Sequence, residues 1–230
     1  MLDKKKTVFH WSSGKDSALA LHQLLQKEEI EVSHLVTTIN QSLQRVTMHG
    51  TPVDLVKRQL ASIDLPFSFI ELPENPSMEV YEECMKDHMQ KLKSEGITHA
   101  AFGDIFLEDL KAYRENEMKA LGFDCQFPLW KKDTRTLIHE FIELGFKAIT
   151  VCVNDELGSK FLGRQIDNEF LNNLPYSIDP CGENGEFHTF CYDGPIFKKP
   201  IEFKLGEKVK RSYPEPSGDG HVNFWFIDLM

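Results

Sequence analysis

The chain has 230 residues, of which 41% are hydrophobic and 27% charged, as is typical of a globular protein large enough to bury a full core. Its 26 Lys and Arg residues against 36 Asp and Glu residues give a formal net charge of −10, which disfavours a general attraction to nucleic-acid phosphates. The sequence contains neither an apolar run as long as a membrane helix nor a signal-peptide pattern, so we expect a cytoplasmic protein.

The first half of the chain alternates strand and helix patterns. Predicted strands cover Thr7–Trp11, Val32–Ile39, Phe67–Leu72 and His99–Gly103. Predicted helices cover Asp16–Glu28, Thr51–Ser62 with Pro52 near its first position, Ser77–Glu95 and Leu107–Leu121. This alternation predicts an α/β fold with a parallel sheet and helices on both faces.

The pattern changes near Pro128–Trp130, where we place a boundary between domains 1–130 and 131–230. The second part contains a predicted helix over Thr134–Leu144, followed by short predicted strands at Ala148–Val153, Thr189–Tyr192, Ile201–Lys204, Val209–Tyr213 and Val222–Asp228. We expect a smaller C-terminal α+β domain. The apolar tail Val222–Ile227 is suited to pairing at a sheet edge or a subunit interface, which leaves a homodimer open.

The five cysteines give no sign of a metal centre. They are odd in number and no pair has the C-x-x-C spacing: Cys84, Cys125, Cys152, Cys181 and Cys191. We therefore expect reduced thiols, without a disulfide framework, a zinc site or an iron–sulfur centre.

The strongest motif is the segment between the first strand and the first helix. Backbone N–H groups and the helix dipole bind phosphate at such a position. The segment adds a glycine for close approach, a cation, three hydroxyls, and a carboxylate suited to a helix cap or a magnesium contact: Ser12, Ser13, Gly14, Lys15, Asp16 and Ser17. It is not a Walker A loop, because Phe9 occupies the first glycine position and Asp16 follows the lysine. The alternative is an ordinary capped helix after a serine-rich turn.

Ligands of a parallel sheet bind beyond the carboxyl ends of its strands. Thr38 lies where backbone groups could contact adenosine, and Gly103 and Asp104 follow the fourth strand at the same edge. Asp104 suits a magnesium or substrate contact, with a turn or cap aspartate as the alternative. His49, in the loop after the second strand, is more readily a packing or surface histidine.

The second domain contains an unusual glycine-rich loop with two carboxylates three residues apart: Gly182, Glu183, Asn184, Gly185, Glu186, Phe187 and His188. Such carboxylates could hold magnesium, orient an amine or accept its proton. The alternative is a simple turn before the following strand.

Residues 12–17 resemble the SGGKDS loop of the PP-loop ATP pyrophosphatases, which are adenine nucleotide alpha hydrolase-like proteins. The match departs at Ser13, where the family usually has glycine; this is harmless if the φ angle of Ser13 is negative and strained if it is positive. Within that superfamily the chain resembles the diphthine–ammonia ligase family over roughly residues 7–205. The matching segments are Gly182–Phe190, Tyr192–Phe197, Pro128–Trp130, Glu143–Ala148 and Leu162–Arg164.

The resemblance implies a Rossmann-like, HUP-type sheet and an ATP-dependent ligase that uses Mg²⁺ and forms AMP and pyrophosphate. It implies that ATP adenylates the carboxylate of diphthine on an elongation factor and that ammonia then displaces AMP. The implied catalytic residues are Lys15, Asp16, Glu183 and Glu186. The implied ATP contacts are Ser12, Ser13, Gly14, Lys15, Asp16, Ser17, Thr38, Gly103 and Asp104, with Asp16 and Asp104 as magnesium contacts. The implied acceptor contacts are Arg114, Gly182, Glu183, Asn184, Glu186 and His188.

The segment Gly103–Glu115 departs from the archaeal members of the family, which have a Tyr-Gln-Lys-Ser-Arg type helix start, although Arg114 could serve as the equivalent arginine. The segment is similar to a divergent subgroup that we associate with bacteria, where diphthamide is not expected. The reaction type therefore carries over better than the acceptor.

Two other functions remain open. A tRNA-modifying PP-loop ATPase is disfavoured by the net charge and the lack of paired cysteines. A nucleotide-binding module without turnover is disfavoured by the intact Lys15–Ser17 segment and the full second domain.

Overall fold

The computed structural model describes residues 4–47, 50–214 and 220–230. The first part of the chain forms a mainly parallel sheet from β1 (Lys5–His10), β2 (Ile30–Asn40), β4 (Phe67–Leu72), β5 (His99–Ala101) and β6 (Asp124–Gln126). The strands lie in the order β4-β2-β1-β5-β6, and the short β3 (Arg45–Val46) pairs antiparallel with the end of β2. β1 lies between β2 and β5, which places the loop after it at the middle of the carboxyl edge.

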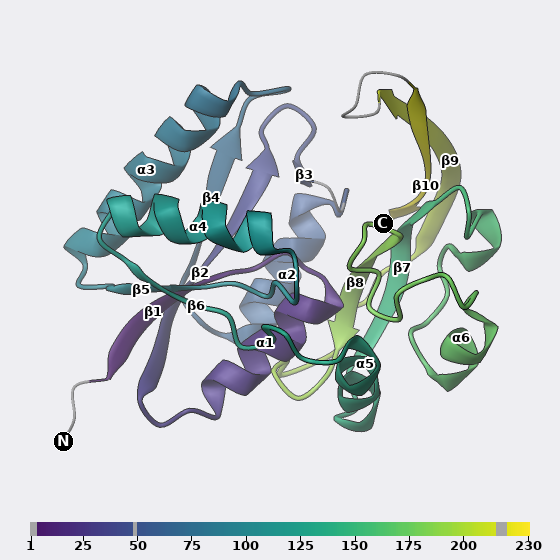
Figure 1. Cartoon of the computed structure of the whole chain (residues 1–230), viewed down its shortest axis with the longest axis horizontal. Helices are drawn as coiled ribbons and strands as arrows, with labels where there is room; N and C mark the ends of the chain where they lie inside the picture. Colours follow the sequence, from purple (N-terminus) through teal and green to yellow (C-terminus); the bar gives the residue numbers. More distant parts are fainter. Residues whose placement is uncertain (1–3, 48–49, 215–219) are drawn as a thin grey trace.

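Four helices cover the two faces of this sheet (Figure 1). On one face α3 (Met78–Ser94) and α4 (Glu108–Ala120) enclose a core that includes Met89 and Met118. On the other face α1 (Lys15–Leu25) and α2 (Val53–Ile63) bury Leu21, Leu24 and Leu60 in a second core. The predicted α/β class, a parallel sheet covered on both faces, is confirmed.

The second part forms a smaller antiparallel sheet in the order β8-β7-β10-β9. Its strands are β7 (Lys147–Asn154), β8 (Phe187–Asp193), β9 (Leu205–Pro214) and β10 (His221–Leu229). The helices α5 (Thr134–Glu143) and α6 (Asn168–Asn173) and the 3₁₀ turn η1 (Ser159–Phe161) complete it, which confirms the expected smaller α+β part.

The two parts share one hydrophobic core, because α1 lies between the two sheets. Backbone and side-chain hydrogen bonds join them at the start of this helix. The Cys191 N–H donates to the Ser13 carbonyl at 2.9 Å, and the Lys15 N–H donates to Thr189 Oγ1 at 3.0 Å. The loop after β1 is therefore fixed from both sides.

Pro52, expected near the first position of α2, is its N-cap. Two local predictions were wrong. Residues Ile201–Lys204 are not a strand, and β9 begins only at Leu205. The apolar tail is not at a sheet edge: β10 lies between β7 and β9. The strands β3 and β6 and the helix α6 were not predicted, and His49 lies outside the described residues.

The five thiols are free, as their spacing predicts. Within the described ranges, the structure contains no helix of the length and apolarity needed to cross a bilayer.

Candidate active site

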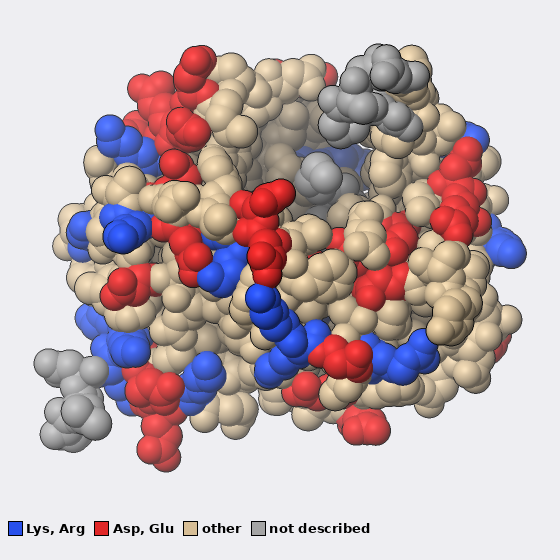
Figure 2. Space-filling model, viewed as in Figure 1, with Lys and Arg blue, Asp and Glu red and all other residues tan. Residues whose placement is uncertain are grey.

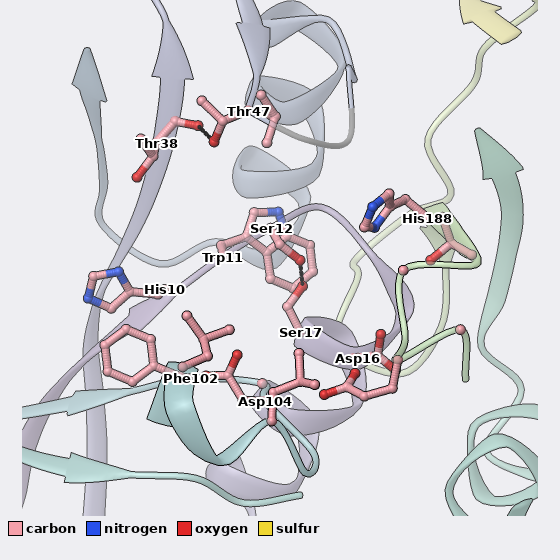
Figure 3. Close-up of a pocket in the computed structure, with 18 of the residues that line it drawn as sticks. His10, Trp11, Ser12, Asp16, Ser17, Thr38, Thr47, Phe102, Asp104 and His188 are labelled. Carbon is pink, nitrogen blue, oxygen red and sulfur yellow. Dashed lines mark hydrogen bonds between the residues drawn. The ribbon is translucent and has the colours of Figure 1, made fainter. Parts of the chain in front are cut away.

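The loop after β1 opens into a cavity of about 1010 Å³ at the carboxyl edge of the sheet. Figure 2 shows the molecule hollowed between the α3 side and the β9–β10 side. Twelve of the fifteen site residues predicted from the sequence line this cavity: Ser12, Lys15, Asp16, Ser17, Thr38, Gly103, Asp104, Arg114, Gly182, Glu183, Asn184 and His188. Segments far apart in the sequence thus converge on one space (Figure 3).

The hydroxyl groups of Ser12 and Ser17 lie at the N-terminus of α1. The Ser12 hydroxyl donates to Ser17 Oγ at 3.1 Å, and Ser17 Oγ donates to the Gly14 carbonyl at 3.0 Å. Gly14 is the N-cap of α1 with an extended backbone, φ −91°. The Lys15 N–H that follows donates to Thr189 Oγ1, and the N–H groups of Asp16 and Ser17 come next at the helix N-terminus, a position that binds anions.

Ser13 adopts the left-handed conformation, with φ 73°. The usual glycine of the family tolerates this conformation, whereas a side chain makes it strained. The side chain of Ser13 is buried away from the cavity, and its Oγ lies 3.2 Å from Thr51 Oγ1 in a hydrogen bond. This buried hydrogen bond opposes the strain, so Ser13 shapes the loop without lining the cavity.

Lys15 is only 2% exposed although its ammonium group belongs to the cavity wall. Its Nζ forms an ion pair with Asp16 at 2.7 Å, donates to the Cys181 carbonyl, and lies 5.2 Å from the centre of the Phe187 ring. Burial acts to lower the pKa of Lys15, but the negative groups around its ammonium, Asp16 foremost and Glu183 among them, together outweigh burial and raise the pKa. The lysine is therefore a permanent cation where the loop meets the second sheet.

The loop after β5 approaches the start of α1 closely. A Cβ atom at Gly103 would lie 3.2 Å from the Ser17 Cα and N atoms, so a side chain there would press on the helix backbone. The next residue, Asp104, forms an ion pair with Arg114 of α4, with Nε and Oδ2 3.0 Å apart. Burial raises the pKa of Asp104 above its usual value, although the Arg114 guanidinium opposes the rise.

Glu183 faces the phosphate loop from the second domain. Its Oε1 accepts a hydrogen bond from the Ile105 N–H at 3.0 Å, which joins the glycine-rich loop of the second domain to the loop after β5. Burial, reinforced by the negative charge of Asp16, raises the pKa of Glu183 to about 7. A carboxylate with this pKa can both accept and release a proton near neutral pH.

Glu186 is buried and takes no place in the cavity wall. Its carboxylate accepts the Asp179 N–H at 3.0 Å, the Asn184 N–H at 2.9 Å and the Asn184 amide at 3.0 Å. These bonds close the loop that carries Glu183. Glu186 is thus one of the predicted acceptor contacts that the structure places outside the cavity wall.

The cavity contains several residues that the sequence did not single out. His10, the last residue of β1, stacks on Phe102 with ring centres 4.3 Å apart (Figure 3). Burial and the positive charge of Arg114 lower the pKa of His10 to about 3, so its ring is neutral. Strand alternation could have indicated His10, since it points to the face opposite Phe9 and Trp11 at the carboxyl end of β1. Tyr81 and Phe224 had no such signal.

Asp16 and Asp104 could hold magnesium only if other ligands, such as nucleotide phosphates and water, complete its coordination. No group of three His, Cys, Asp or Glu side chains in the described parts of the chain is arranged to bind a metal ion. Mg²⁺ commonly takes one or two carboxylates and completes its shell with nucleotide phosphates and water. Both carboxylates line the cavity beside the phosphate loop, so they fit an ion that arrives with a nucleotide.

Comparison with known proteins gives the chain its relatives. Curated diphthine–ammonia ligases are 33% identical over 148 residues in Bos taurus and 33% identical over 149 residues in Homo sapiens. Each match covers 58% of this chain and 55% of the relative, so the chain spans about half the length of these proteins. The Schizosaccharomyces pombe ligase is 35% identical over 107 residues, which are 44% of this chain and 18% of that protein.

A solved structure, the U34-tRNA thiolase NcsA from Methanococcus maripaludis with its [4Fe-4S] cluster, superposes with a TM-score of 0.38 and 17% identity. The superposition covers 63% of this chain and 58% of that one, a likeness too distant to support a functional conclusion. The family model of the diphthamide synthase N-terminal domain matches residues 5–124, and that of the C-terminal domain matches residues 133–218. The chain therefore belongs to the diphthamide synthase family, that of the diphthine–ammonia ligases.

Proposed function

We propose that the protein is an ATP-dependent amide ligase that forms AMP and pyrophosphate, as the names of its relatives and its own cavity suggest. The observation that carries the proposal is the convergence in one cavity of a phosphate-binding loop, a half-buried carboxyl with a pKa of about 7, and a cationic side chain. These are the groups that a carboxylate adenylation followed by ammonia attack requires.

The phosphates of ATP are held by the N–H groups of Asp16 and Ser17 in the first turn of α1, by the Ser12 and Ser17 hydroxyls, and by the Lys15 ammonium. Asp16 and Asp104 would hold a magnesium ion that arrives with the nucleotide, and the ion would supply further neutralisation of the phosphate charge. Binding the pyrophosphate portion at a helix N-terminus stabilises it as the leaving group. Attack at the α-phosphorus is thereby favoured over attack at the γ-phosphorus.

The acceptor carboxylate is assigned to the part of the cavity near Arg114. Arg114 Nε is held by the Asp104 carboxylate at 3.0 Å, and His10 Nε2 is buried in the same wall without a hydrogen-bond partner in the described part of the chain. A buried polar atom is rarely left unpaired, so a bound group that pairs with His10 is expected here. Diphthine on an elongation factor is the acceptor implied by the relatives, and another carboxylate would use the same groups.

In the first step an acceptor carboxylate oxygen bonds to the α-phosphorus, and the bond to pyrophosphate breaks. In the second, the ammonia lone pair attacks the acyl carbon and the bond to AMP breaks. The proton that the nitrogen loses passes to Glu183, whose position is fixed by Ile105 and by the Glu186-bonded loop.

We also propose that the chain divides near residue 130, acts in the cytoplasm and forms a homodimer.

The test is an assay for conversion of ATP to AMP and pyrophosphate that depends on ammonia, run against protein extracts and metabolite pools. With the acceptor carboxylate labelled by heavy oxygen, one labelled atom should appear in AMP. ADP as the product, or label in inorganic phosphate, would rule out the adenylate. A salt-sensitive shift with tRNA would favour the tRNA-modifying alternative, and binding without turnover would favour the non-catalytic one.

A further inference from the structure

The cavity extends from the phosphate loop in two directions. On one side lie His10 and Phe102, with Asp104 near them, and this wall contains the charged pair Asp104–Arg114 (Figure 3). On the other side lie Thr38 and Thr47 (Figure 3). Val46, the neighbour of Thr47, and Phe224 also line the cavity. These four described residues contain no charged side chain, which suits a flat, uncharged ring better than a carboxylate.

Phe224 comes from β10, in the second sheet, and the register of that strand explains how it reaches the cavity. Alternate residues of a strand point to the same face. Asp228 forms an ion pair with Arg45 of β3, with its Oδ1 2.8 Å from Nη2. Two residues earlier, Phe226 faces Gly50, where an added Cβ would lie 3.8 Å from the ring. Phe224, two residues before Phe226, lies on the same face of β10 and lines the cavity.

The β9–β10 hairpin therefore rests on the β2–β3 region and brings an aromatic ring over it. Figure 1 shows β9 and β10 on the side of the molecule that faces β3. The Phe224 ring is half-buried and is supported by Tyr213 of β9, with ring centres 6.3 Å apart. The match to the C-terminal family model ends at residue 218, before β10 begins.

We propose that Phe224 forms one wall of the adenine subsite, where the base of ATP stacks on its ring and lies against Val46 and Thr47 on the opposite wall. This inference rests on the proposed function, since it requires that ATP binds with its phosphates on residues 12–17. The nucleotide is then held by both sheets: its phosphates by the loop after β1, and its base between β2–β3 and β10. Closing the adenine subsite thus depends on a strand at the far end of the chain.

The test compares two probes, ATP and inorganic tripolyphosphate, by titration calorimetry on the full-length protein in the presence of magnesium. Tripolyphosphate keeps the phosphates and lacks the base. Phe224→Ala should raise the Kd of ATP by about 10-fold, because a base–aromatic stack contributes on this order, and leave the Kd of tripolyphosphate unchanged. Phe224→Tyr keeps an aromatic face and should bind ATP as the wild type does.

The matched control is Trp225→Ala, one residue along and on the opposite face of β10, where its Nε1 donates to Asp155 Oδ1 at 3.0 Å. This variant should bind both probes normally. An unchanged ATP Kd in Phe224→Ala, or equal losses for both probes, would overturn the inference. If the wild type binds tripolyphosphate but not ATP, or binds neither probe, both the adenine subsite and the proposed function are refuted. If the wild type binds ATP and only the effect of Phe224→Ala is missing, the adenine subsite is refuted and the proposed function is unaffected.

Discussion

Replacing Glu183 by glutamine tests whether this carboxyl takes the proton from ammonia. Glutamine keeps an oxygen that can accept the Ile105 N–H, so the loop should hold its position while the base is removed. Loss of a general base of this kind lowers the rate by about 10²- to 10⁴-fold. The affinity for ATP should change little, because Glu183 comes from outside the sheet that carries the phosphate loop.

The rate should depend on pH through the ionisation of Glu183. With a pKa of about 7, Glu183 is about half ionised at pH 7 and about one tenth ionised at pH 6. Only the ionised form accepts a proton, so the rate of the wild-type protein should fall about tenfold between pH 7 and about pH 5.8. Since free ammonia also decreases as the pH falls, rates must be compared at constant free ammonia.

The raised pKa of Glu183 also makes the stability of the fold depend on pH. Folding raises the pKa of Glu183 from 4.5 to about 7, so the folded state favours the neutral carboxyl. Stability is then greatest below pH 4.5 as far as this group is concerned, and it declines as the pH rises from about 4.5 towards about 7. Glu183→Gln should lack this decline, and chemical denaturation at several pH values would measure the difference.

The assay is release of AMP at saturating ATP, between pH 5.5 and about 8.5, for the wild type, Glu183→Gln and the exposed control Glu202→Gln. The control should follow the wild type. Equal acid limbs in the wild type and Glu183→Gln would refute the assignment, because the pH dependence would then arise from another group. So would a large loss of ATP binding with the ammonia step intact.

Three further outcomes are expected. Lys15→Met should reduce ATP turnover by at least about 100-fold with the fold retained, as activity and circular dichroism would report, and turnover at the wild-type rate would refute the assigned role. Ser13→Ala keeps the left-handed strain and loses the hydrogen bond to Thr51, so it should lower the free energy of unfolding by about 1–3 kcal/mol. Ser13→Gly relieves the strain and should stay within about 1 kcal/mol of the wild type. Denaturant titrations measure both values, and a less stable Ser13→Gly than Ser13→Ala would contradict the role of strain. Glu186→Gln places an amide donor among three N–H donors, so it should lower the melting temperature and the turnover together, and a loss of turnover at full stability would point to direct contact with substrate.

Much of the first sheet could be predicted because strand and helix patterns alternate along this half of the chain, and helices such as α1 and α2 have a clear apolar face. The phosphate loop, its lysine and the carboxylates of the second domain could be recognised from their residue types and order. The short β6 escaped notice because Asp124–Gln126 has only three residues and no apolar pattern. The segment Ile201–Lys204 reads as a strand locally, but its hydrogen bonds go to Tyr192 and to the chain end at Met230.

Side-chain direction was the part that sequence could not supply. Glu183 and Glu186 are equivalent by composition, yet one faces the phosphate loop and the other bonds its own loop. His10 and Phe224 enter the cavity only because β1 ends there and because β10 packs beside β3. Such contacts depend on the packing of elements distant in sequence, and motif spacing does not encode them.

The position of α1 between the two sheets has a consequence for how such a protein can be divided or rearranged. The left-handed turn at Ser13 receives a hydrogen bond from Cys191, and the first helical N–H bonds Thr189. A fragment that ends near residue 130 would lack both partners, together with the Cys181 carbonyl that Lys15 contacts. The nucleotide loop therefore takes its shape from the far half of the chain. We expect longer proteins that carry this module to inherit its two halves together, with added segments placed outside them.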